Sequence, residues 1–433
     1  MPTEHPGPRP LGGAVPLGPG TPARRPEPEA LVAPRTAGVP ENVVEPYEPV
    51  PLAATAVDPN ARLPVGFAKL AVNRAYDEGG QPAFWLTGQS GDPELSFDSE
   101  DTRLRPSDLA LSNLRPDGFP PTEIFRAVAA WSGHQEDVVR WINGLRARFG
   151  ADLHLVIWDD TDYDIPWEML RLTGGRAHGV DDGILGALVT VVRWTTIREA
   201  GSTPFNEPAD CTGHVVGYYA EEMRRDATVF ENFEHIGHFG TTRTFLGELT
   251  RPGLGAGLVY MGCHATHGPN LFKLKLGSVT WHELNDLDMS ALDGRRTLVC
   301  LNACHSAQFV NNRPLGENAL RGFAELFLRK GAGGCIATSG KVGDDVAHTL
   351  IRDLIGRLCA DPELPVARAL RDFRAAAVAR LPDPLPFVYG DDDQIDIEGQ
   401  RRILPILYSF MFLYFGHPLT TLRLSVRAQE ART

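Results

Sequence analysis

Two apolar runs in the second half of the sequence end in residues that could act together as a nucleophile and a base. Two residues separate the run 258–261 from His264, and two residues separate the run 298–301 from Cys304. A cysteine attacks a carbonyl group well only as the thiolate, so it needs a base beside it. A histidine, which titrates near neutral pH, can take the thiol proton and later return it to a leaving amine. The pattern therefore predicts acyl transfer with Cys304 as nucleophile and His264 as base.

An oxyanion forms when a thiolate attacks a peptide carbonyl, and backbone N–H groups at strand-to-loop turns can stabilise it. The N–H groups of Cys304 and of a residue between Gly262 and Ala265 are in suitable places, directly after the two apolar runs. We therefore expect the oxyanion to be held by the backbone.

These residues need a sheet that brings the ends of distant strands together. Nearly continuous apolar runs, typical of strands covered on both faces, occur at residues 153–158, 258–261, 298–301 and 334–338. Helical spacing of apolar residues occurs at 136–149, 317–330 and 345–359. Strands that alternate with helices predict an α/β fold: a three-layer α/β/α sandwich with a mixed, mainly parallel sheet. If the strands before His264 and Cys304 are parallel neighbours, both side chains emerge at one edge of this sheet.

The chain divides by composition into three regions. Residues 1–60 hold 15 of the 35 prolines and a single aromatic residue, Tyr47, so they are predicted to be a disordered tail. Residues 61–120 contain two short strand patterns, at 67–72 and 83–86, and are expected to form a small β-rich accessory region that precedes or extends the main sheet. Residues 121–425 form the predicted catalytic domain.

Several motifs, in this order along the chain, resemble those of the CHAT domain family, a group of caspase-like cysteine peptidases of bacteria. The matching segments are Asp164-Ile165-Pro166-Trp167-Glu168-Met169-Leu170, the strand that ends in Cys263-His264, Leu301-Asn302-Ala303-Cys304, the glycine-rich residues 331–338, and Tyr414-Phe415-Gly416-His417-Pro418. The resemblance covers roughly residues 120–425. It implies a caspase-like fold, a Cys-His dyad that hydrolyses protein substrates, a role in bacterial (antiviral) defence or cell death, and activation by a partner protein or bound effector.

The sequence departs from the family pattern at two places. The family usually has glycine directly after its histidine, whereas Ala265 follows His264; the His-Gly pair occurs at His267, which is therefore the alternative base. Related metacaspases also carry an aspartate two residues before the cysteine, where it helps to bind a basic substrate side chain, and this chain has Asn302 there. We expect Asn302 to border the substrate pocket and Asp160, or the adjacent Asp159, to be able to supply the missing charge.

Other residues near these motifs have structural interpretations. We expect Trp167 to fill space beneath the sheet and Glu168 to accept hydrogen bonds from a loop, while His305 is a neighbour of the nucleophile and His348 is solvated on a helix. Two alternative functions remain open: a catalytically silent caspase-like interaction module, and a zinc-binding protein that uses nitrogen and sulfur donors of the Cys263 and Cys304 segments.

Composition limits the other classes of function. The net charge of -13 gives no basic footprint for direct binding of nucleic acid. The longest apolar run, residues 403–415, is too short to cross a bilayer. The N-terminus lacks the layout of a secretory signal, so we expect a cytoplasmic protein whose six cysteines are reduced. No cofactor and no metal ion is required by the predicted chemistry.

Overall fold

A mixed β-sheet with helices on both faces organises the molecule. The computed structural model describes residues 63–106, 109–111, 120–197, 208–292, 294, 296–312, 319–390 and 394–427. The predicted disordered tail, residues 1–60, lies outside the described residues, and the boundaries of the three predicted regions stay predictions.

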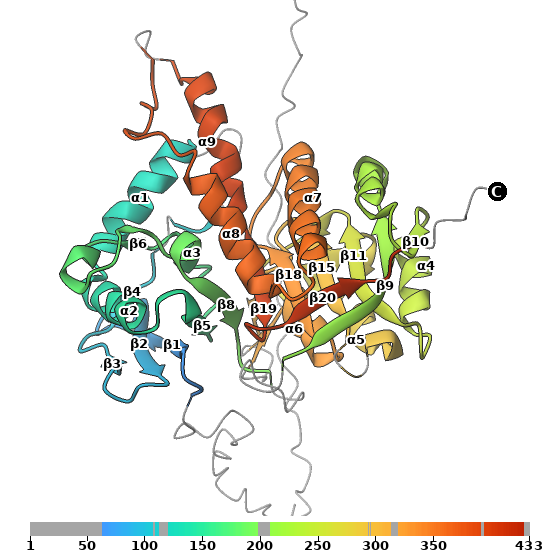
Figure 1. Ribbon diagram of the computed structural model, residues 1–433, viewed down its shortest axis with the longest axis horizontal. Helices are drawn as coiled ribbons and strands as arrows, with labels where there is room; N and C mark the ends of the chain where they lie inside the picture. Colours follow the sequence, from blue (N-terminus) through green and yellow to red (C-terminus); the bar gives the residue numbers. More distant parts are fainter. Residues whose placement is uncertain are drawn as a thin grey trace, which may run out of the picture. The chain divides into compact units, whose positions relative to one another are not determined.

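The strands that carry the predicted dyad lie side by side near one end of this sheet (Figure 1). Across the sheet the order is β10 (His235–His238), β9 (Asp210–Tyr219), β11 (Ala256–Gly262), β15 (Leu298–Asn302), β18 (Gly334–Thr338), β19 (Phe412–Gly416), β8 (Thr190–Trp194), β5 (His154–Asp159), β1 (Phe67–Tyr76), β2 (Pro82–Ser90) and β3 (Phe97–Asp98). Two further strands join it beside this path, namely β20 (Thr421–Leu424) on β9 and β4 (Arg103–Leu104) on β2. Most neighbours run parallel, whereas β1–β2, β18–β19 and the pairs of β2 with β3 and β4 are antiparallel.

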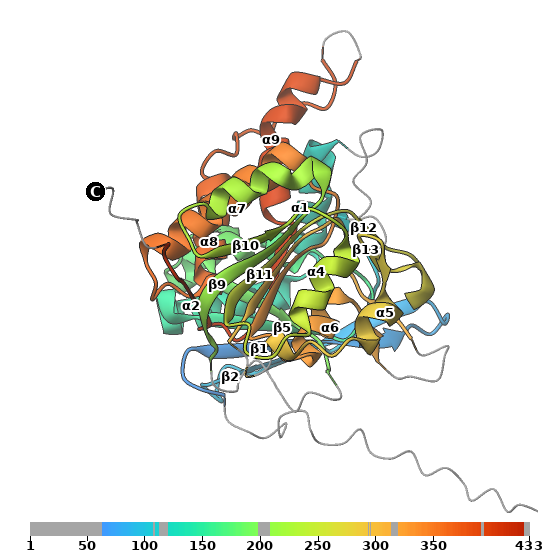
Figure 2. The same ribbon diagram turned by 90° about the vertical axis from the view of Figure 1, so that its right-hand side faces the viewer.

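Helices cover both faces of the sheet, so the predicted three-layer α/β/α architecture is confirmed. Figure 2 shows α7 (Asp344–Ala360) and α8 (Val366–Val378) on one side of the strands and α4 (Thr242–Leu249) and α5 (Trp281–Asp286) on the other. Every residue of β11 and of β15 is buried, as the nearly continuous apolar runs predict for strands covered on both faces.

The remaining elements are short or lie at the periphery of the sheet. The helices are α1 (Pro121–Gly133), α2 (Glu136–Phe149), α3 (Leu185–Leu188), α6 (Phe323–Arg329) and α9 (Ile397–Ser409). The 3-10 helices are η2 (Gly150–Asp152), η3 (Trp167–Met169), η4 (Gly175–His178), η5 (Glu221–Phe230), η6 (Leu271–Lys273) and η7 (Ser290–Leu292). The small strands are β6 (Arg171–Leu172), β7 (Gly183–Ile184), β12 (Ala265–Thr266), β13 (Lys275–Leu276), β14 (Val279–Thr280), β16 (Val310–Asn311) and β17 (Leu320–Arg321).

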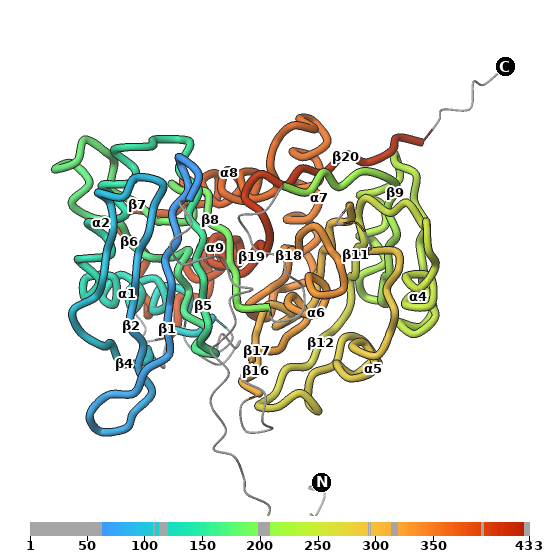
Figure 3. Tube along the Cα trace, turned by 90° about the horizontal axis from the view of Figure 1, so that it is seen from below, coloured from blue at the N-terminus to red at the C-terminus, as the bar shows by residue number. Residues whose placement is uncertain are grey.

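The β-rich segment near the N-terminus extends the main sheet. β1 and β2 form an antiparallel hairpin, and β1 also pairs in parallel with β5 from Phe67↔His154 to Val72↔Asp159. Figure 3 shows this hairpin beside β5, with β19 and β18 lying between it and β11. One of the two arrangements expected for the segment, extension of the sheet, is thus the one observed.

Two predicted elements differ from the structure. The helix expected over 317–330 begins only at Phe323, because Leu320 and Arg321 pair with β16 and Gly322 is fully extended at φ -166°. The apolar run 403–415 is divided between the end of α9 and the first four residues of β19, since the chain turns at residues 410–411. Within the described residues, no helix combines the length and the apolar composition needed to span a bilayer.

Candidate functional site

The ends of β11 and β15 bring the two dyad candidates to one edge of the sheet. The strands are parallel, and Gly262 is the register partner of Asn302. The Cys263 N–H donates to the Asn302 carbonyl at 3.3 Å, which extends the pairing by one residue. His264 and Cys304 therefore each lie two residues beyond the same register pair, as expected for parallel neighbours.

Cys304 is half-buried beneath the segment that joins β18 to α7. The Val342 N–H points at its sulfur, and the His305 N–H donates to the Gly340 carbonyl at 3.2 Å. His305 has a left-handed backbone conformation, with φ of 59°, which marks a sharp turn directly after the nucleophile candidate. Burial raises the pKa of the Cys304 thiol, although the Val342 N–H and the charge of Lys341 oppose this effect. The thiol therefore needs a base before it can attack.

His264 lies on the surface, and its closest charged neighbour is a carboxylate. Its side chain is 65% exposed, and its Nε2 atom lies 3.7 Å from Oε2 of Glu222 in η5. In the described part of the chain, no hydrogen bond joins the His264 imidazole to the Cys304 thiol. The two groups thus share the edge of the sheet without being engaged with each other.

His267, the alternative base, occupies a different environment. It lies beyond β12, and burial lowers its pKa to about 4, with a further contribution from the nearby His305. Its Nε2 atom is buried and has no hydrogen-bond partner among the described residues. An imidazole with so low a pKa is a weak base, because its protonated form gives up the proton readily.

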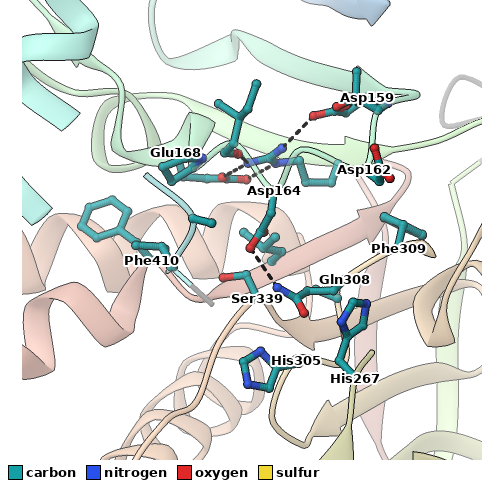
Figure 4. Close-up of a pocket in the computed structure, with 18 of the residues that line it drawn as sticks. Asp159, Asp162, Asp164, Glu168, His267, His305, Gln308, Phe309, Ser339 and Phe410 are labelled. Carbon is teal, nitrogen blue, oxygen red and sulfur yellow. Dashed lines mark hydrogen bonds and ion pairs between the residues drawn. The ribbon is translucent and has the colours of Figure 1, made fainter. Parts of the chain in front are cut away.

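A cavity of about 570 Å³ lies next to the turn that carries Cys304. On the side of β15 and β18 its lining includes His267, His305, Gln308 and Ser339. On the side of β5 it includes Asp159 at the end of that strand, Asp162 and Asp164 in the loop that follows, and Glu168 in η3. Figure 4 shows the His267 and His305 rings across the cavity from the Asp159 and Glu168 carboxylates, with Gln308 bonded to Asp164 between them at 2.9 Å. The cavity therefore combines carboxylates, neutral imidazoles and the cation Lys341.

An ion pair that is almost fully buried forms the far wall of this cavity. The Arg193 guanidinium donates to both oxygens of Glu168, at 2.8 and 2.5 Å, and to the Ile165 carbonyl at 2.9 Å. Burial opposes ionisation of Glu168, but attraction to Arg193 outweighs it, so the pKa of Glu168 is lowered. Asp159 lies farther from the cation, at 3.8 Å, and burial raises its pKa.

Trp167 and Glu168, the Trp-Glu motif, both make structural contacts. Trp167 is fully buried, as expected, and its indole N–H donates to Asp159 at 3.3 Å. Glu168 accepts its hydrogen bonds from the Arg193 side chain of β8, not from a loop. The motif thus fixes the loop after β5 to the neighbouring strand.

The side chains of the two residues expected at the substrate pocket make internal hydrogen bonds. Asn302 is buried, and its amide donates to Asp226 Oδ2 at 3.1 Å and to the Tyr260 hydroxyl at 2.9 Å. Asp160 accepts hydrogen bonds from Thr195 and Thr196, including the Thr196 N–H at 2.7 Å. Neither is among the described residues that line the cavity, whereas Asp159, the other carboxylate considered, is. The side chains of Asn302 and Asp160 are used to hold strands and loops in place.

Asp226 in η5 is the centre of a buried polar cluster that the sequence did not reveal. The Tyr260 hydroxyl donates to its Oδ2 at 2.6 Å, and His348 Nδ1 lies 2.8 Å from its Oδ1. The expectation that His348 is solvated is therefore wrong: its side chain is only 17% exposed and faces this carboxylate from α7. No local signal marks the cluster, because its four members come from four separate elements.

The two backbone positions expected at the oxyanion site are held firmly. The Gly262 carbonyl accepts from the Ala220 N–H at 2.8 Å. Ala265 is the register partner of Leu276 in the β12–β13 ladder. The neighbouring pair is His264 and Gly277, in which the Gly277 N–H donates to the His264 carbonyl at 2.8 Å. Because bonded and non-bonded pairs alternate in antiparallel ladders, the Ala265 N–H points away from β13.

Two of the cysteines considered for zinc lie in the hydrophobic core. Cys263 and Cys300 are buried in the core, and burial raises the pKa of the Cys263 thiol to about 12. Among the described residues, no group of three or more His, Cys, Asp or Glu side chains is arranged to hold a metal ion.

Known proteins were compared with the chain at the level of sequence and of structure. Residues 236–384 match the family model of the CHAT domain. No curated protein matches the sequence.

Solved structures with some similarity include the Arg-specific cysteine proteinase gingipain R, at 11% identity and a TM-score of 0.43, covering 66% of this chain and 68% of that one. A complex of the Porphyromonas gingivalis RgpB pro- and mature domains matches at 11% identity and a TM-score of 0.42, covering 66% of this chain and 70% of that chain. The Saccharomyces cerevisiae separase in its securin complex matches at 10% identity and a TM-score of 0.42, with 82% of this chain and 30% of separase covered.

The matched family residues include β11, β15 and the loops that follow them, so His264 and Cys304 both lie inside the matched segment. The motifs around Glu168 and Tyr414 lie outside it. The resemblance to the CHAT domain inferred from the motifs is confirmed by this match over residues 236–384.

Proposed function

We propose that this protein is a cysteine endopeptidase that hydrolyses protein substrates with a dyad of Cys304 and His264. The observation that carries the proposal is the register of β11 and β15, which brings the two residues to the same edge beside a cavity able to accept a substrate side chain. Parallel α/β sheets commonly bind their ligands at such carboxyl ends.

The reaction follows from the two side chains. The imidazole of His264 accepts the proton of the Cys304 thiol, and the thiolate attacks the scissile carbonyl carbon. The tetrahedral oxyanion is stabilised by N–H groups of Cys304 and Ala265. The imidazolium gives the proton to the leaving amine, and a thioester remains on Cys304. Water, deprotonated by the same imidazole, then hydrolyses the thioester.

Two observations favour His264 over His267 as the base. His264 directly follows the pairing of β11 with β15 and has a carboxylate beside it. The pKa of His267, lowered to about 4 by burial, makes it a poor acceptor for a thiol proton. His267 instead contributes a neutral imidazole to the cavity wall.

The enzyme of this proposal is regulated. The Cys304 thiol is half-buried under residues 339–343 and is not hydrogen-bonded to His264, so the dyad assembles in only a minor fraction of the free molecules, and that fraction sets the basal rate of thiol modification. A partner protein or bound effector that shifts residues 339–343 would expose the thiol and let the two groups meet. A place in a bacterial defence or cell-death system, which the family resemblance implies, belongs to this proposal.

The experiment is mass-spectrometric mapping of a peptide-electrophile library on wild type, Cys304→Ala, His264→Ala and His267→Ala. The proposal predicts a single modified site at Cys304, a rate reduced at least tenfold in His264→Ala, and a smaller effect of His267→Ala. Equal rates in wild type and His264→Ala would refute the dyad.

A catalytically silent interaction module is the second candidate. The specific observation in its favour is the missing hydrogen bond between the two dyad side chains. A module of this kind would leave Cys304 no more reactive than an ordinary half-buried thiol in every variant of the same experiment.

A further inference from the structure

A carboxylate next to His264 comes from η5, which contains none of the sequence motifs. Glu222 Oε2 lies 3.7 Å from His264 Nε2, and both side chains are largely exposed. We propose that Glu222 is a positioning residue for His264, an inference that rests on the dyad proposed above.

The backbone on both sides of Glu222 is fixed to the end of β11. The Ala220 N–H donates to the Gly262 carbonyl at 2.8 Å. Met223 is buried and packs so closely on the strand end that a Cβ atom at Gly262 would lie 3.2 Å from the Met223 Cβ atom. Glu222 therefore stands between two residues held against the same strand end that carries His264.

A second anchor fixes η5 to both dyad strands. Asp226, one turn after Glu222, is buried and accepts hydrogen bonds from Tyr260 of β11 at 2.6 Å and from Asn302 of β15 at 3.1 Å. The segment that presents Glu222 is thus bound to the strand of the base and to the strand of the nucleophile. A carboxylate with such a support keeps its place without being buried itself.

The position of the carboxylate has a chemical consequence for the imidazole. Beside Nε2, it favours the tautomer that carries the proton on Nε2 and leaves Nδ1 as the acceptor. When Nδ1 takes the proton from the Cys304 sulfur, the imidazolium formed is attracted by the Glu222 carboxylate. Glu222 then acts through His264 and touches neither substrate nor thiolate.

The sign of the effect distinguishes this role from a direct one. A carboxylate that acted on Cys304 through space would disfavour the thiolate, so its removal would increase the reactivity of the thiol. A carboxylate that acts through His264 favours proton transfer, so its removal decreases that reactivity.

The test is the second-order rate of Cys304 alkylation by iodoacetamide, followed by peptide mass spectrometry on the full chain. The variants are Glu222→Gln, His264→Ala, the double variant of the two, and Glu221→Gln as the matched control. Glu221 is the exposed neighbour in η5, so its substitution changes the net charge by the same amount. Because iodoacetamide is small and neutral, the rate does not depend on a substrate pocket.

Glu222→Gln is expected to slow alkylation about two- to fivefold, the range of an exposed ion pair, while Glu221→Gln leaves the rate unchanged. In the His264→Ala background, Glu222→Gln should have no further effect. A faster reaction in Glu222→Gln, an equal effect of Glu221→Gln, or the same slowing in the absence of His264 would each overturn the assignment while leaving the dyad intact. An unchanged rate in His264→Ala alone would instead refute the dyad, and the role of Glu222 with it.

Discussion

Replacing Glu168 by glutamine removes the anionic half of a buried ion pair while keeping the volume of the side chain. The Glu168 and Arg193 side chains are only 3% and 8% exposed, so water can replace little of the lost attraction. Arg193 would retain the Ile165 carbonyl at 2.9 Å and Asp159 at 3.8 Å, and the latter contact is too long for a hydrogen bond. A buried cation that loses its partner in this way costs about 3–5 kcal/mol of the free energy of unfolding.

Urea unfolding followed by circular dichroism measures this loss as a shift of the midpoint at constant slope. Glu248→Gln is the matched control, since Glu248 pairs with Arg251 on the surface, where the Arg251 side chain is 65% exposed. The control should cost at most about 1 kcal/mol. Combining Glu168→Gln with Arg193→Met should cost less than the sum of the two single changes, because each single change leaves an unmatched charge.

The reasoning fails if Glu168→Gln and Glu248→Gln destabilise the protein equally, or if the double variant is additive. Either result would mean that the Trp-Glu motif is not held by this ion pair. The loop after β5, which lines the cavity, would then owe its position to other contacts.

Three further outcomes follow from other groups. Because the pKa of Glu168 is lowered in the folded protein, its stabilising contribution is present above the unfolded pKa of 4.5 and is lost as the pH falls below 4.5. Below about pH 4.5, the free energy of unfolding measured in urea should therefore fall more steeply in wild type than in Glu168→Gln. Asp226→Ala leaves two buried donors without an acceptor and should lower the free energy of unfolding by about 2–5 kcal/mol, measured by the same urea method; a loss below 1 kcal/mol would contradict the cluster. Brief alkylation at pH 8 should modify Cys304 before Cys359, because burial raises the pKa of Cys359 to about 11. Cys263 should react only when the protein unfolds, and early labelling of Cys263 in a peptide map would contradict this order.

The sequence was informative where a signal is local. The nearly continuous apolar runs before His264 and Cys304 gave strands within two residues of their observed limits, and the two ends meet at one edge because parallel strands share their direction. The amphipathic pattern of 136–149 likewise corresponds to α2.

It was uninformative where side chains from distant segments meet. Asn302 was expected at a pocket because of its place in a motif, but the end of a strand has two faces, and this side chain faces the buried Asp226. His348 was expected in solvent, because a helical pattern does not reveal a carboxylate 122 residues away in sequence. Glu222 lacks any motif, and only the return of η5 to the end of β11 brings it to His264.

The place of β19 in the sheet has a consequence for the order in which the chain can fold. This strand lies between β18, which is next to the dyad strand β15, and β8, which is next to β5. It is nevertheless formed by residues 412–416, late in the sequence. During synthesis the ribosome must release nearly all of the described chain before these two halves can be joined. Contacts so distant in sequence raise the contact order and slow folding. In a chain built in this way, the edge that carries Cys304 and the loop after β5 can be joined through the sheet only after residues 412–416 have been synthesised.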